Sequence, residues 1–438
     1  MRHKRREAPR QLCGCCVRRG RAEPLGSAHG RSPCRLRTLC HLTQVRHVRY
    51  ERAIEGEPSR RRTPVAPFVL RRARRNRPRP ENGEIELLLG RPARDVGGGD
   101  AAAYLNLATV LVTGAAGSIG AELCRRVARA GARRLVLVEQ AEAPLVELAG
   151  DLGDAGVEVV PVLADVRSLP RALDVLERHR PDVVFHAAAY KQVPLLEEHP
   201  IEAVATNVLG TAAVVAAALR AGVQRLVFFS TDKAVEATSV LGRTKAAAEW
   251  IVASAGRENG AAYTSIRLGN VVDSAGSILP RFRRQLGCGA ALTVTDPQAT
   301  RYVMTVGEAA GLAIAAGALA EPEVVFLLDC GPPVQIVDLA RRLARAHHVE
   351  ARIEIVGLRP GERLHERLCR DDDVVDKTAF PYVLCTPVER VAPEWLDRRI
   401  AALARHAELA SAADVRAALA ELHEPAPVQL SASVTLAS

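Results

Sequence analysis

The few lysines of the chain are its clearest candidates for chemistry. Only five of the 60 basic residues are lysines, and the rest are arginines. Arginine cannot act as a general base, and its planar fork does not fit a compact ammonium site. Lys191, Lys233 and Lys245 fall at or just beyond the ends of apolar, strand-like runs. We therefore regard these three as candidate catalytic or binding residues.

The densest cluster is Thr231-Asp232-Lys233, with Lys245 one helix start later. Adjacent Asp232 and Lys233 offer an acid and a base over one substrate. Lys245 has the spacing of the Tyr-x-x-x-Lys pair of short-chain dehydrogenases, in which the lysine binds the nicotinamide ribose and lowers the tyrosine pKa. Here the tyrosine position is Leu241, which cannot take a proton, so another group must do so. The alternative interpretation of the cluster is a solvated Asp-Lys turn.

A glycine-rich loop predicts a dinucleotide site. Gly114, Gly117 and Gly120 follow an apolar run and open a helical stretch. These glycines would allow a tight turn, a close approach to a pyrophosphate and close helix–strand packing. The free N–H groups of the helix start, at Ser118 and Ile119, would then hold the diphosphate. Because the strand before and the helix after agree with the triplet, this motif is specific.

Further residues are expected along the same cofactor. Glu139 ends the second strand, where a carboxylate would bind the adenosine ribose and repel a 2′-phosphate, which favours NAD over NADP. The alternative is an ordinary solvated glutamate. Asp165, which ends the third strand, is expected at the adenine amino group, and Val166 beside it is expected to contact the cofactor. Ala187 and Ala189 supply small side chains where the cofactor passes close to the backbone.

Strand-like and helix-like segments alternate from Asn106 onward. This pattern, with strands apolar on both faces, indicates a doubly wound parallel sheet of the Rossmann type, an α/β fold, with a smaller C-terminal substrate-binding domain. The predicted strands are Thr109–Thr113, Arg134–Glu139, Val157–Asp165, Asp182–Ala188, Arg225–Ser230, Tyr263–Leu268 and Glu323–Asp329. Predicted helices include Ala121–Ala130 and Pro200–Ala221, and two short segments, Ala291–Val294 and Arg352–Val356, fall in the smaller domain. The predicted domains are a leader (1–80), a linker (81–105), an NAD-binding domain (106–270, with 305–330 returning to it), a nucleotide-sugar-binding domain (271–304 and 331–390) and a helical or partly disordered tail (391–438).

The basic charge is concentrated at the N-terminus. Residues 1–80 carry a net charge of +18, so the remainder must carry −8 to give the total of +10. This arginine-rich segment is interpreted as a disordered leader or an upstream start site, with an arm for RNA or a membrane surface as the alternative. We expect no nucleic-acid binding outside it. Its Cys13-x-x-Cys16 pair resembles half a zinc site, but the next pair, Cys34 and Cys40, is separated by five residues and no second Cys-x-x-Cys follows, so no metal site is predicted.

The scattered cysteines after residue 81 are typical of reduced thiols. No uninterrupted apolar stretch approaches the roughly 18 residues of a membrane span, and no signal peptide is visible. We therefore expect a cytoplasmic protein without a transmembrane segment.

Several motifs together resemble one family. They match the polysaccharide-biosynthesis (CapD-like) nucleotide-sugar 4,6-dehydratases, members of the extended short-chain dehydrogenase/reductase superfamily that act on UDP-N-acetylglucosamine. The resemblance runs from about Glu84 to Arg370. The matching motifs are Thr113–Gly120, Ala187–Pro194, Thr206–Thr211, Ser230–Val235, Arg267–Val271, Arg301–Thr305 and Gly357–Glu362.

The resemblance implies a reaction in three steps. NAD takes a hydride from C4 of the sugar, water leaves across C5 and C6, and the hydride returns to C6. On this template Asp232 protonates the departing 6-hydroxyl, Lys233 removes the C5 proton, Thr231 bonds O4, and Lys245 holds the nicotinamide ribose. The implied UDP-sugar contacts are Lys191, Asn270, Thr293, Arg301, Arg359 and Glu362, with the two arginines at the diphosphate. A homo-oligomer is also expected.

The chain departs from the family in three places. First, Leu241 stands where many members have Met. Second, Glu236 and Ala237 interrupt the usual sequence after Lys233. Third, the N-terminal transmembrane helices of the long members are not found, so the membrane-anchored form is not expected. Two alternatives to a dehydratase stay open. A nucleotide-sugar 4-epimerase would share the cofactor site but normally needs the tyrosine that Leu241 replaces. A catalytically silent NAD-binding regulator or scaffold would not need Asp232 and Lys233.

Overall fold

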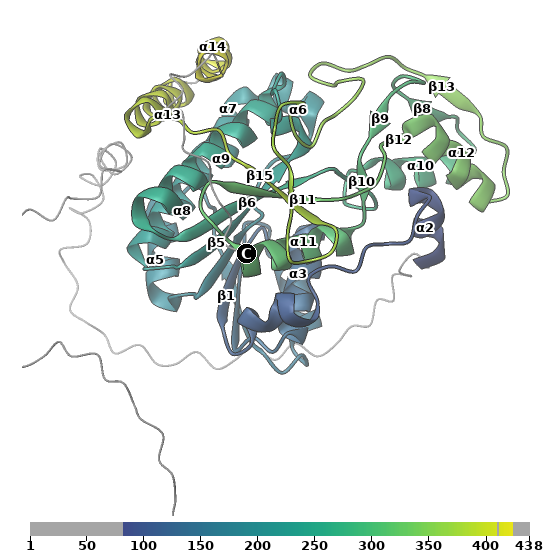
Figure 1. Ribbon diagram of the computed structural model, residues 1–438. Helices are drawn as coiled ribbons and strands as arrows, with labels where there is room; N and C mark the ends of the chain where they lie inside the picture. The colour runs from purple at the N-terminus through teal and green to yellow at the C-terminus, as the bar shows by residue number, and fades with distance from the viewer. Residues whose placement is uncertain (1–81, 410, 424–438) are drawn as a thin grey trace, which may run out of the picture. The chain divides into compact units, whose positions relative to one another are not determined.

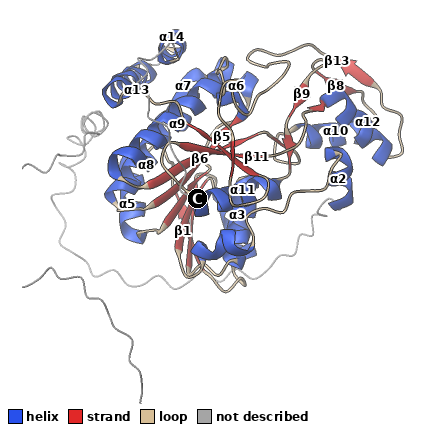
Figure 2. Ribbon diagram, in the orientation of Figure 1, coloured by secondary structure: helices blue, strands red, loops and turns tan. Residues whose placement is uncertain are grey.

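A computed structural model describes residues 82–409 and 411–423. The predictions for residues 1–80 therefore lie outside the described residues. The core is a nine-stranded sheet in the order β14-β15-β11-β6-β5-β4-β1-β2-β3, shown in red in Figure 2. Its strands are β1 (Thr109–Thr113), β2 (Arg134–Glu139), β3 (Glu158–Leu163), β4 (Val183–His186), β5 (Arg225–Thr231), β6 (Ala262–Leu268), β11 (Val324–Leu328), β14 (Asp376–Lys377) and β15 (Val383–Pro387).

The predicted doubly wound parallel sheet is confirmed. From β11 to β3 all neighbouring strands pair in parallel, and β15 and β14 extend the sheet in antiparallel fashion. Every residue of β1 is buried, as expected for a strand covered on both faces. The strand order reverses between β1 and β4, so a crevice is expected at their carboxyl ends. Predicted and observed strand ends differ by at most two residues.

Helices cover both faces of this sheet (Figure 1). Leu123, Leu148 and Leu312 share one hydrophobic core with the sheet, whereas Ala172 and Val252 share the other. The first face carries α3 (Ser118–Arg129), α4 (Glu142–Leu152) and α11 (Val306–Leu319); the second carries α5 (Leu169–His179), α8 (Gly210–Arg220) and α9 (Val240–Asn259). Two short helices, α6 (Val193–Glu198) and α7 (Pro200–Ala203), and a 3-10 turn, η3 (Asp232–Ala234), complete this part.

The predicted helix Pro200–Ala221 is interrupted by a π-helical segment. Between α7 and α8, η2 (Val204–Leu209) has π-helical bonding. Such segments often occur at functional sites because they redirect side chains. Here Asn207 is fully buried, and its side chain bonds the main chain of Tyr190 and the hydroxyl of Thr244. Residues Pro200–Arg220 pass a length and hydropathy test for a membrane span, but 67% of the tested window is buried inside the fold.

A smaller domain has its own core. Leu279, Phe282, Leu339 and Leu343 are fully buried together there. Its elements are β7 (Asn270–Val271), α10 (Ile278–Gly287), β8 (Leu292–Val294), β9 (Thr300–Arg301), β10 (Val303–Met304), β12 (Val334–Gln335), α12 (Ile336–Ala346) and β13 (Ile353–Ile355). The two segments predicted as short strands pair with each other as β8 and β13.

The segment predicted as a linker is folded onto both parts of the protein. It contains α2 (Asn82–Leu89) and a 3-10 helix, η1 (Gly99–Leu105). Leu88 joins the core of the smaller domain, while Leu105 joins that of the large sheet. Between them, Arg91 forms an ion pair with buried Glu308 at the start of α11.

The predicted helical tail consists of α13 (Pro393–Glu408) and α14 (Ala412–Leu422). Both pack on α9 and share its hydrophobic core. Trp395 of α13 meets Trp250 edge to face with ring centroids 6.2 Å apart, and the His423 ring lies 5.0 Å from Trp250. The burial of apolar side chains of α13 and α14 against α9 therefore stabilises these two helices.

Candidate functional site

A cavity of about 680 Å³ lies at the carboxyl ends of the strands, between the sheet and the smaller domain. A cavity of this size fits a drug-sized or larger ligand. The structure brings together most of the predicted site residues in its lining. These are Gly114, Gly117, Ser118, Ile119, Gly120, Ala187, Ala189, Lys191, Thr231, Lys233, Lys245, Asn270, Arg301, Arg359 and Glu362.

The glycine loop forms one end of this cavity. Gly114 has a φ of +64° and connects β1 to the turn before α3. A Cβ at Gly114 would lie 2.8 Å from the backbone of Ala188, and one at Gly120 would lie 2.2 Å from the oxygen of Gly114. Gly117 is the N-cap of α3, so the first N–H groups of that helix have no partner within the helix. The loop has the space and the free donors that a diphosphate needs.

Thr231, Asp232 and Lys233 are linked at the end of β5. Thr231 Oγ1 donates a 2.9 Å hydrogen bond to Asp232 Oδ1, and Lys233 Nζ donates to the same oxygen at 2.9 Å. Asp232 is fully buried, and its Oδ2 has no hydrogen-bond partner. The short 3-10 turn after Thr231 makes adjacent side chains converge. A hydroxyl, a carboxylate and an amine can therefore exchange protons here.

Lys233 contacts a second carboxylate that the sequence analysis missed. Its Nζ lies 3.6 Å from Glu366 Oε1 and donates to Asn270 Oδ1 at 3.3 Å. Burial lowers the pKa of Lys233, but Asp232 and Glu366 outweigh it and raise the pKa above its usual value. Glu366 follows the Gly357–Glu362 motif by four residues, and this proximity was the available signal for it.

Lys245 and Leu241 lie on one side of the cavity, on α9. Lys245 Nζ donates a 2.7 Å hydrogen bond to the oxygen of Phe229 and lies 4.6 Å from the ring centroid of Phe228. Burial lowers the pKa of Lys245 to about 7. Leu241 is nearly fully buried, so the position of the usual tyrosine is filled by an apolar side chain.

A buried histidine, His186, lies beneath the glycine loop. His186 bonds Thr113 at 2.7 Å and Thr211 at 3.0 Å through its two ring nitrogens. Burial lowers its pKa to about 3, and the charge of Lys245 contributes. The histidine is therefore neutral and ties β1, β4 and α8 together beneath the glycine loop.

The three residues predicted at the adenosine do not line the cavity. The carboxylate of Glu139 accepts main-chain N–H groups from Ala116, Gln140 and Ala141, at 3.3, 2.9 and 3.2 Å. Its contact with Ala116 nevertheless places it beside the glycine loop. Asp165 pairs with Arg167, and that pair lowers its pKa against the effect of burial.

Val166, the third of these residues, packs toward α8. A Cβ at Gly210 would lie 3.2 Å from its side chain. Of the three, Glu139 contacts the glycine loop, whereas Asp165 pairs with Arg167 and Val166 lies against Gly210 of α8.

The opposite end of the cavity is rich in arginine. Arg359 pairs with Glu362 at 2.5 Å, and Arg281 and Arg284 line the same wall. Arg281 Nε is buried without a partner, and burial and the charge of Arg359 lower the pKa of Arg281. This end therefore favours an anionic group.

Arg301 has a different environment from the one expected of a ligand contact. Its guanidinium donates to three main-chain oxygens, those of Thr300, Leu364 and Arg363, at 2.7, 2.9 and 2.8 Å. It lines the cavity, but these bonds also fix the segment that carries Glu366.

Of the two remaining residues predicted to contact the UDP-sugar, Lys191 lines the cavity and Thr293 does not. Lys191 lines the cavity, donates to Ser274 at 3.2 Å, and has a pKa lowered by burial. Thr293 does not line it; its hydroxyl accepts a 2.9 Å hydrogen bond from Gln285, and Thr295 of the same segment lines the cavity instead. Thr293 lies within β8, whereas Thr295 lies one residue beyond the end of that strand.

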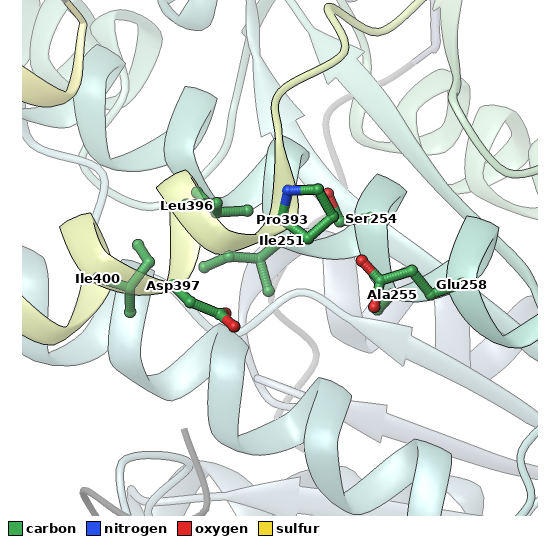
Figure 3. Close-up of a pocket in the computed structure, with 8 residues that line it drawn as sticks. All are labelled: Ile251, Ser254, Ala255, Glu258, Pro393, Leu396, Asp397 and Ile400. Atoms are coloured by element: carbon green, nitrogen blue, oxygen red, sulfur yellow. The ribbon is translucent and has the colours of Figure 1, made fainter. Parts of the chain in front are cut away.

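A second, much smaller cavity of about 20 Å³ lies between α9 and α13 (Figure 3). Ile251 and Leu396 form its apolar wall, and Asp397 and Glu258 lie at its edge. It holds at most a water-sized group. Among residues 82–409 and 411–423, no group of three or more His, Cys, Asp or Glu side chains is placed to hold a metal.

Comparisons with known proteins show which proteins the chain is similar to. Capsular polysaccharide biosynthesis protein CapD from Staphylococcus aureus is 41% identical over 298 residues, covering 66% of this chain and 50% of the relative. The chain thus spans about half the length of this relative. The X-ray structure of Pen from Bacillus thuringiensis aligns with a TM-score of 0.60 and 30% identity, covering 65% of this chain and 89% of that one.

A third comparison concerns the fold. UDP-glucose 4-epimerase from Thermus thermophilus, solved in complex with NAD, aligns with a TM-score of 0.53 and 22% identity, over 59% of this chain and 90% of the other. The family described as "Polysaccharide biosynthesis protein" matches residues 110–387, which include the glycine loop, the Thr231–Lys233 cluster and the arginine-rich end. Since that match spans the sheet and most of the cavity, the chain belongs to the polysaccharide biosynthesis protein family.

Proposed function

We propose that the protein is an NAD-dependent 4,6-dehydratase of a UDP-N-acetylhexosamine, with UDP-N-acetylglucosamine as the expected substrate, in surface polysaccharide synthesis. The observation that carries the proposal is the hydrogen-bonded series Thr231–Asp232–Lys233, in which Thr231 and Lys233 line the cavity and Asp232 is buried outside its lining. In the same cavity Leu241 replaces the usual proton-accepting tyrosine. An elimination needs an acid and a base close together, and this series supplies both.

The residues at the glycine loop fit NAD. The loop leaves no room for a Cβ at Gly114 or Gly120, and α3 presents its free N–H groups to the same space. Glu139, beside Ala116, would disfavour a 2′-phosphate. Lys245 would turn from the oxygen of Phe229 to the nicotinamide ribose. When bound, NAD would accept a hydride from C4 of the sugar and return it at C6.

The geometry at β5 offers a route for the 4-hydroxyl proton. Thr231 already donates its own proton to Asp232, so its oxygen can accept a hydrogen bond from the sugar O4. The O4 proton would pass to Thr231 while the Thr231 proton passes to Asp232. This relay supplies the step that tyrosine performs elsewhere, and it leaves Asp232 protonated.

The same proton can then leave as part of water. Lys233 in its unprotonated amine form removes the C5 proton, the C6–O bond breaks, and Asp232 gives its proton to the departing hydroxyl. Lys233 later returns its proton to C5 as C6 is reduced. The protons balance within the cluster, because Thr231 keeps the O4 proton and the proton that Thr231 gave to Asp232 ends in the water that is released.

The arginine-rich end would hold the UDP diphosphate. Arg359 is partly exposed and paired with Glu362, and Arg281 has an unpartnered Nε. Guanidinium groups suit this role because they bind phosphate oxygens in pairs. Lys191 and Asn270, on the cavity wall between the two ends, would contact the sugar. The expected homo-oligomeric state stays a prediction.

The test is to incubate the purified protein with UDP-N-acetylglucosamine and follow the products by mass spectrometry and NMR. The expected product has lost one water and carries a 4-keto-6-deoxy sugar. A product of unchanged mass with inverted C4 would identify a 4-epimerase and overturn the proposal. No change in the sugar, with NAD binding retained, would instead indicate a regulator or scaffold. Lys233→Ala retaining full dehydration would contradict the role of Lys233.

A further inference from the structure

Glu366 is a buried carboxylate in the cavity wall to which the family resemblance assigns no role. Its side chain is 2% exposed, and its Oε1 lies 3.6 Å from Lys233 Nζ. Its other oxygen, Oε2, is buried without any hydrogen-bond partner. Burying a carboxylate without satisfying it is costly, so its retention at this position needs an explanation.

The backbone around Glu366 is held rigidly. His365 forms a β-bridge with Thr300, whose N–H donates to the oxygen of Leu364 at 3.0 Å. Arg301 bonds the oxygens of both Leu364 and Arg363. Glu366 is therefore aimed at Lys233 by the smaller domain, while Asp232 approaches Lys233 from the sheet.

The charged groups around the pair set its protonation. Lys233 faces Asp232, Glu366 and Arg301, and Glu366 faces Lys233, Asp232, Arg301 and Arg363. Burial raises the pKa of Glu366, with Asp232 adding to the rise and Lys233 opposing it. Asp232 and Glu366 are the two carboxylates in ion-pair contact with Lys233 among the described residues.

We propose, resting on the dehydratase function above, that Glu366 is a positioning residue whose carboxylate stabilises the ammonium formed when Lys233 removes the C5 proton. In that step the C5–H bond breaks, an N–H bond forms on Nζ, and the electron pair moves toward the C4 ketone. Asp232 is then protonated by the relay through Thr231 and carries no charge. Glu366 is the carboxylate that remains to balance the new cation.

The first test compares the pH profiles of the wild type, Glu366→Gln and Glu366→Asp with UDP-N-acetylglucosamine. Removing the carboxylate lowers the pKa of Lys233, so the rising limb of kcat/KM should move to lower pH in Glu366→Gln. The value of kcat should fall roughly tenfold or more. KM should change by less than about threefold, because Glu366 pairs with Lys233 and not with Arg359, an expected diphosphate contact that pairs with Glu362. Glu366→Asp keeps the charge, so its shift of the rising limb and its loss of kcat should both be smaller than those of Glu366→Gln.

A matched control uses Glu323, a largely buried carboxylate outside the cavity that pairs with Arg257 and Arg390. Glu323→Gln removes a buried ion-paired charge of the same type. It should change neither the position of the rising limb of the kcat/KM pH profile nor the value of kcat. An equal shift in both variants, or none in Glu366→Gln, would overturn the inference.

The second test needs no activity. The pH dependence of Lys233 acetylation by acetic anhydride, measured by peptide mass spectrometry, reports its protonation. Lys233 should become reactive at lower pH in Glu366→Gln than in the wild type. An unchanged labelling profile would contradict the inference even if the wild type proved to be a dehydratase. If the wild type forms no keto sugar but the labelling shifts, the proposed function fails while the Glu366–Lys233 coupling stands.

Discussion

Thr231 Oγ1 and Asp232 Oδ1 are joined by a 2.9 Å hydrogen bond in which the hydroxyl is the donor. This direction matters because it leaves the threonine oxygen able to accept a proton from a ligand. A tyrosine phenol would accept that proton directly. Here two small side chains would divide the task, and the proton would end on a fully buried carboxylate.

The first prediction tests this relay. Thr231→Val keeps the shape but removes the hydroxyl, so the O4 proton has no route to Asp232. We expect kcat to fall by about 10²-fold or more, as for the loss of an acid–base group. Thr231→Ser keeps the hydroxyl and should retain most of the activity. Both variants should bind NAD like the wild type in calorimetry; equal activity of Thr231→Val would disprove the relay.

The second prediction concerns Leu241. Because it is not expected to carry a proton, Leu241→Met should keep turnover within a few fold and cost less than about 1.5 kcal/mol of stability. Leu241→Ala should lower the free energy of unfolding by about 2–4 kcal/mol, since the side chain is nearly fully buried. Denaturant titration and turnover at saturating substrate separate the two effects. A complete loss of turnover in Leu241→Met would show that this position has a chemical role after all.

The sequence predicted the sheet well because its signals are local. Apolar runs such as Thr109–Thr113 reproduce a strand to the residue, since a strand buried on both faces must be apolar throughout. Gly114 and Gly120 were recognisable because close backbone approaches tolerate only glycine. Lys233 and Lys245 stood out because arginine could not replace them.

Other features depend on contacts distant in sequence. Glu366 meets Lys233 across 133 positions, and nothing in its own surroundings marks it as buried. The segment between α2 and η1 resembles a linker in composition, yet Arg91 is bound by Glu308, more than 200 residues later. Arg301 was expected at the diphosphate because the family resemblance implied it, and its bonds to main-chain oxygens could not be foreseen from its neighbours.

The third prediction separates Arg301 from Arg359. Arg301→Ala would remove one donor from each of three main-chain oxygens, so the free energy of unfolding should fall by about 2–4 kcal/mol. Turnover should fall too, because the segment bearing Glu366 loosens. Arg359→Ala should leave the thermal midpoint near that of the wild type and raise KM for the UDP-sugar roughly tenfold. The reverse pattern, with Arg301→Ala stable and defective only in KM, would assign Arg301 to the diphosphate.

The fourth prediction uses the depressed pKa of Lys245. Burial lowers that pKa from its unfolded value to about 7, so the charged form destabilises the fold. The cost is fully present below about pH 7 and is relieved as the pH rises from there toward the unfolded lysine pKa. Lys245→Met should therefore be at least as stable as the wild type in mildly acidic buffer, although turnover falls roughly 10²-fold. Lys377→Met, at an exposed lysine on β14, is the control and should change neither quantity; a Lys245→Met that melts well below the wild type at acidic pH would contradict this account.

The fifth prediction concerns Asp397, at the small cavity between α9 and α13. Burial raises its pKa to about 6, and the charges of Glu258 and Glu394 add to the rise. The folded state therefore prefers the protonated acid. The stability from this group is fully present below the unfolded pKa and is lost as the pH rises through about 6. Asp397→Asn, which stays neutral, should melt higher than the wild type at neutral pH.

That advantage should shrink as the pH falls toward the unfolded pKa, where the wild-type acid is protonated as well. Melting temperatures of both proteins across a pH series measure the difference directly, and the difference cancels the effects of all other titrating groups. Glu408→Gln, at an exposed position on the same helix, controls for the loss of one negative charge from α13 and should show no such pH-dependent advantage. A constant difference between Asp397→Asn and the wild type at every pH would mean that Asp397 is ionised alike in the folded and unfolded chains, and that α13 docks on α9 without any electrostatic cost.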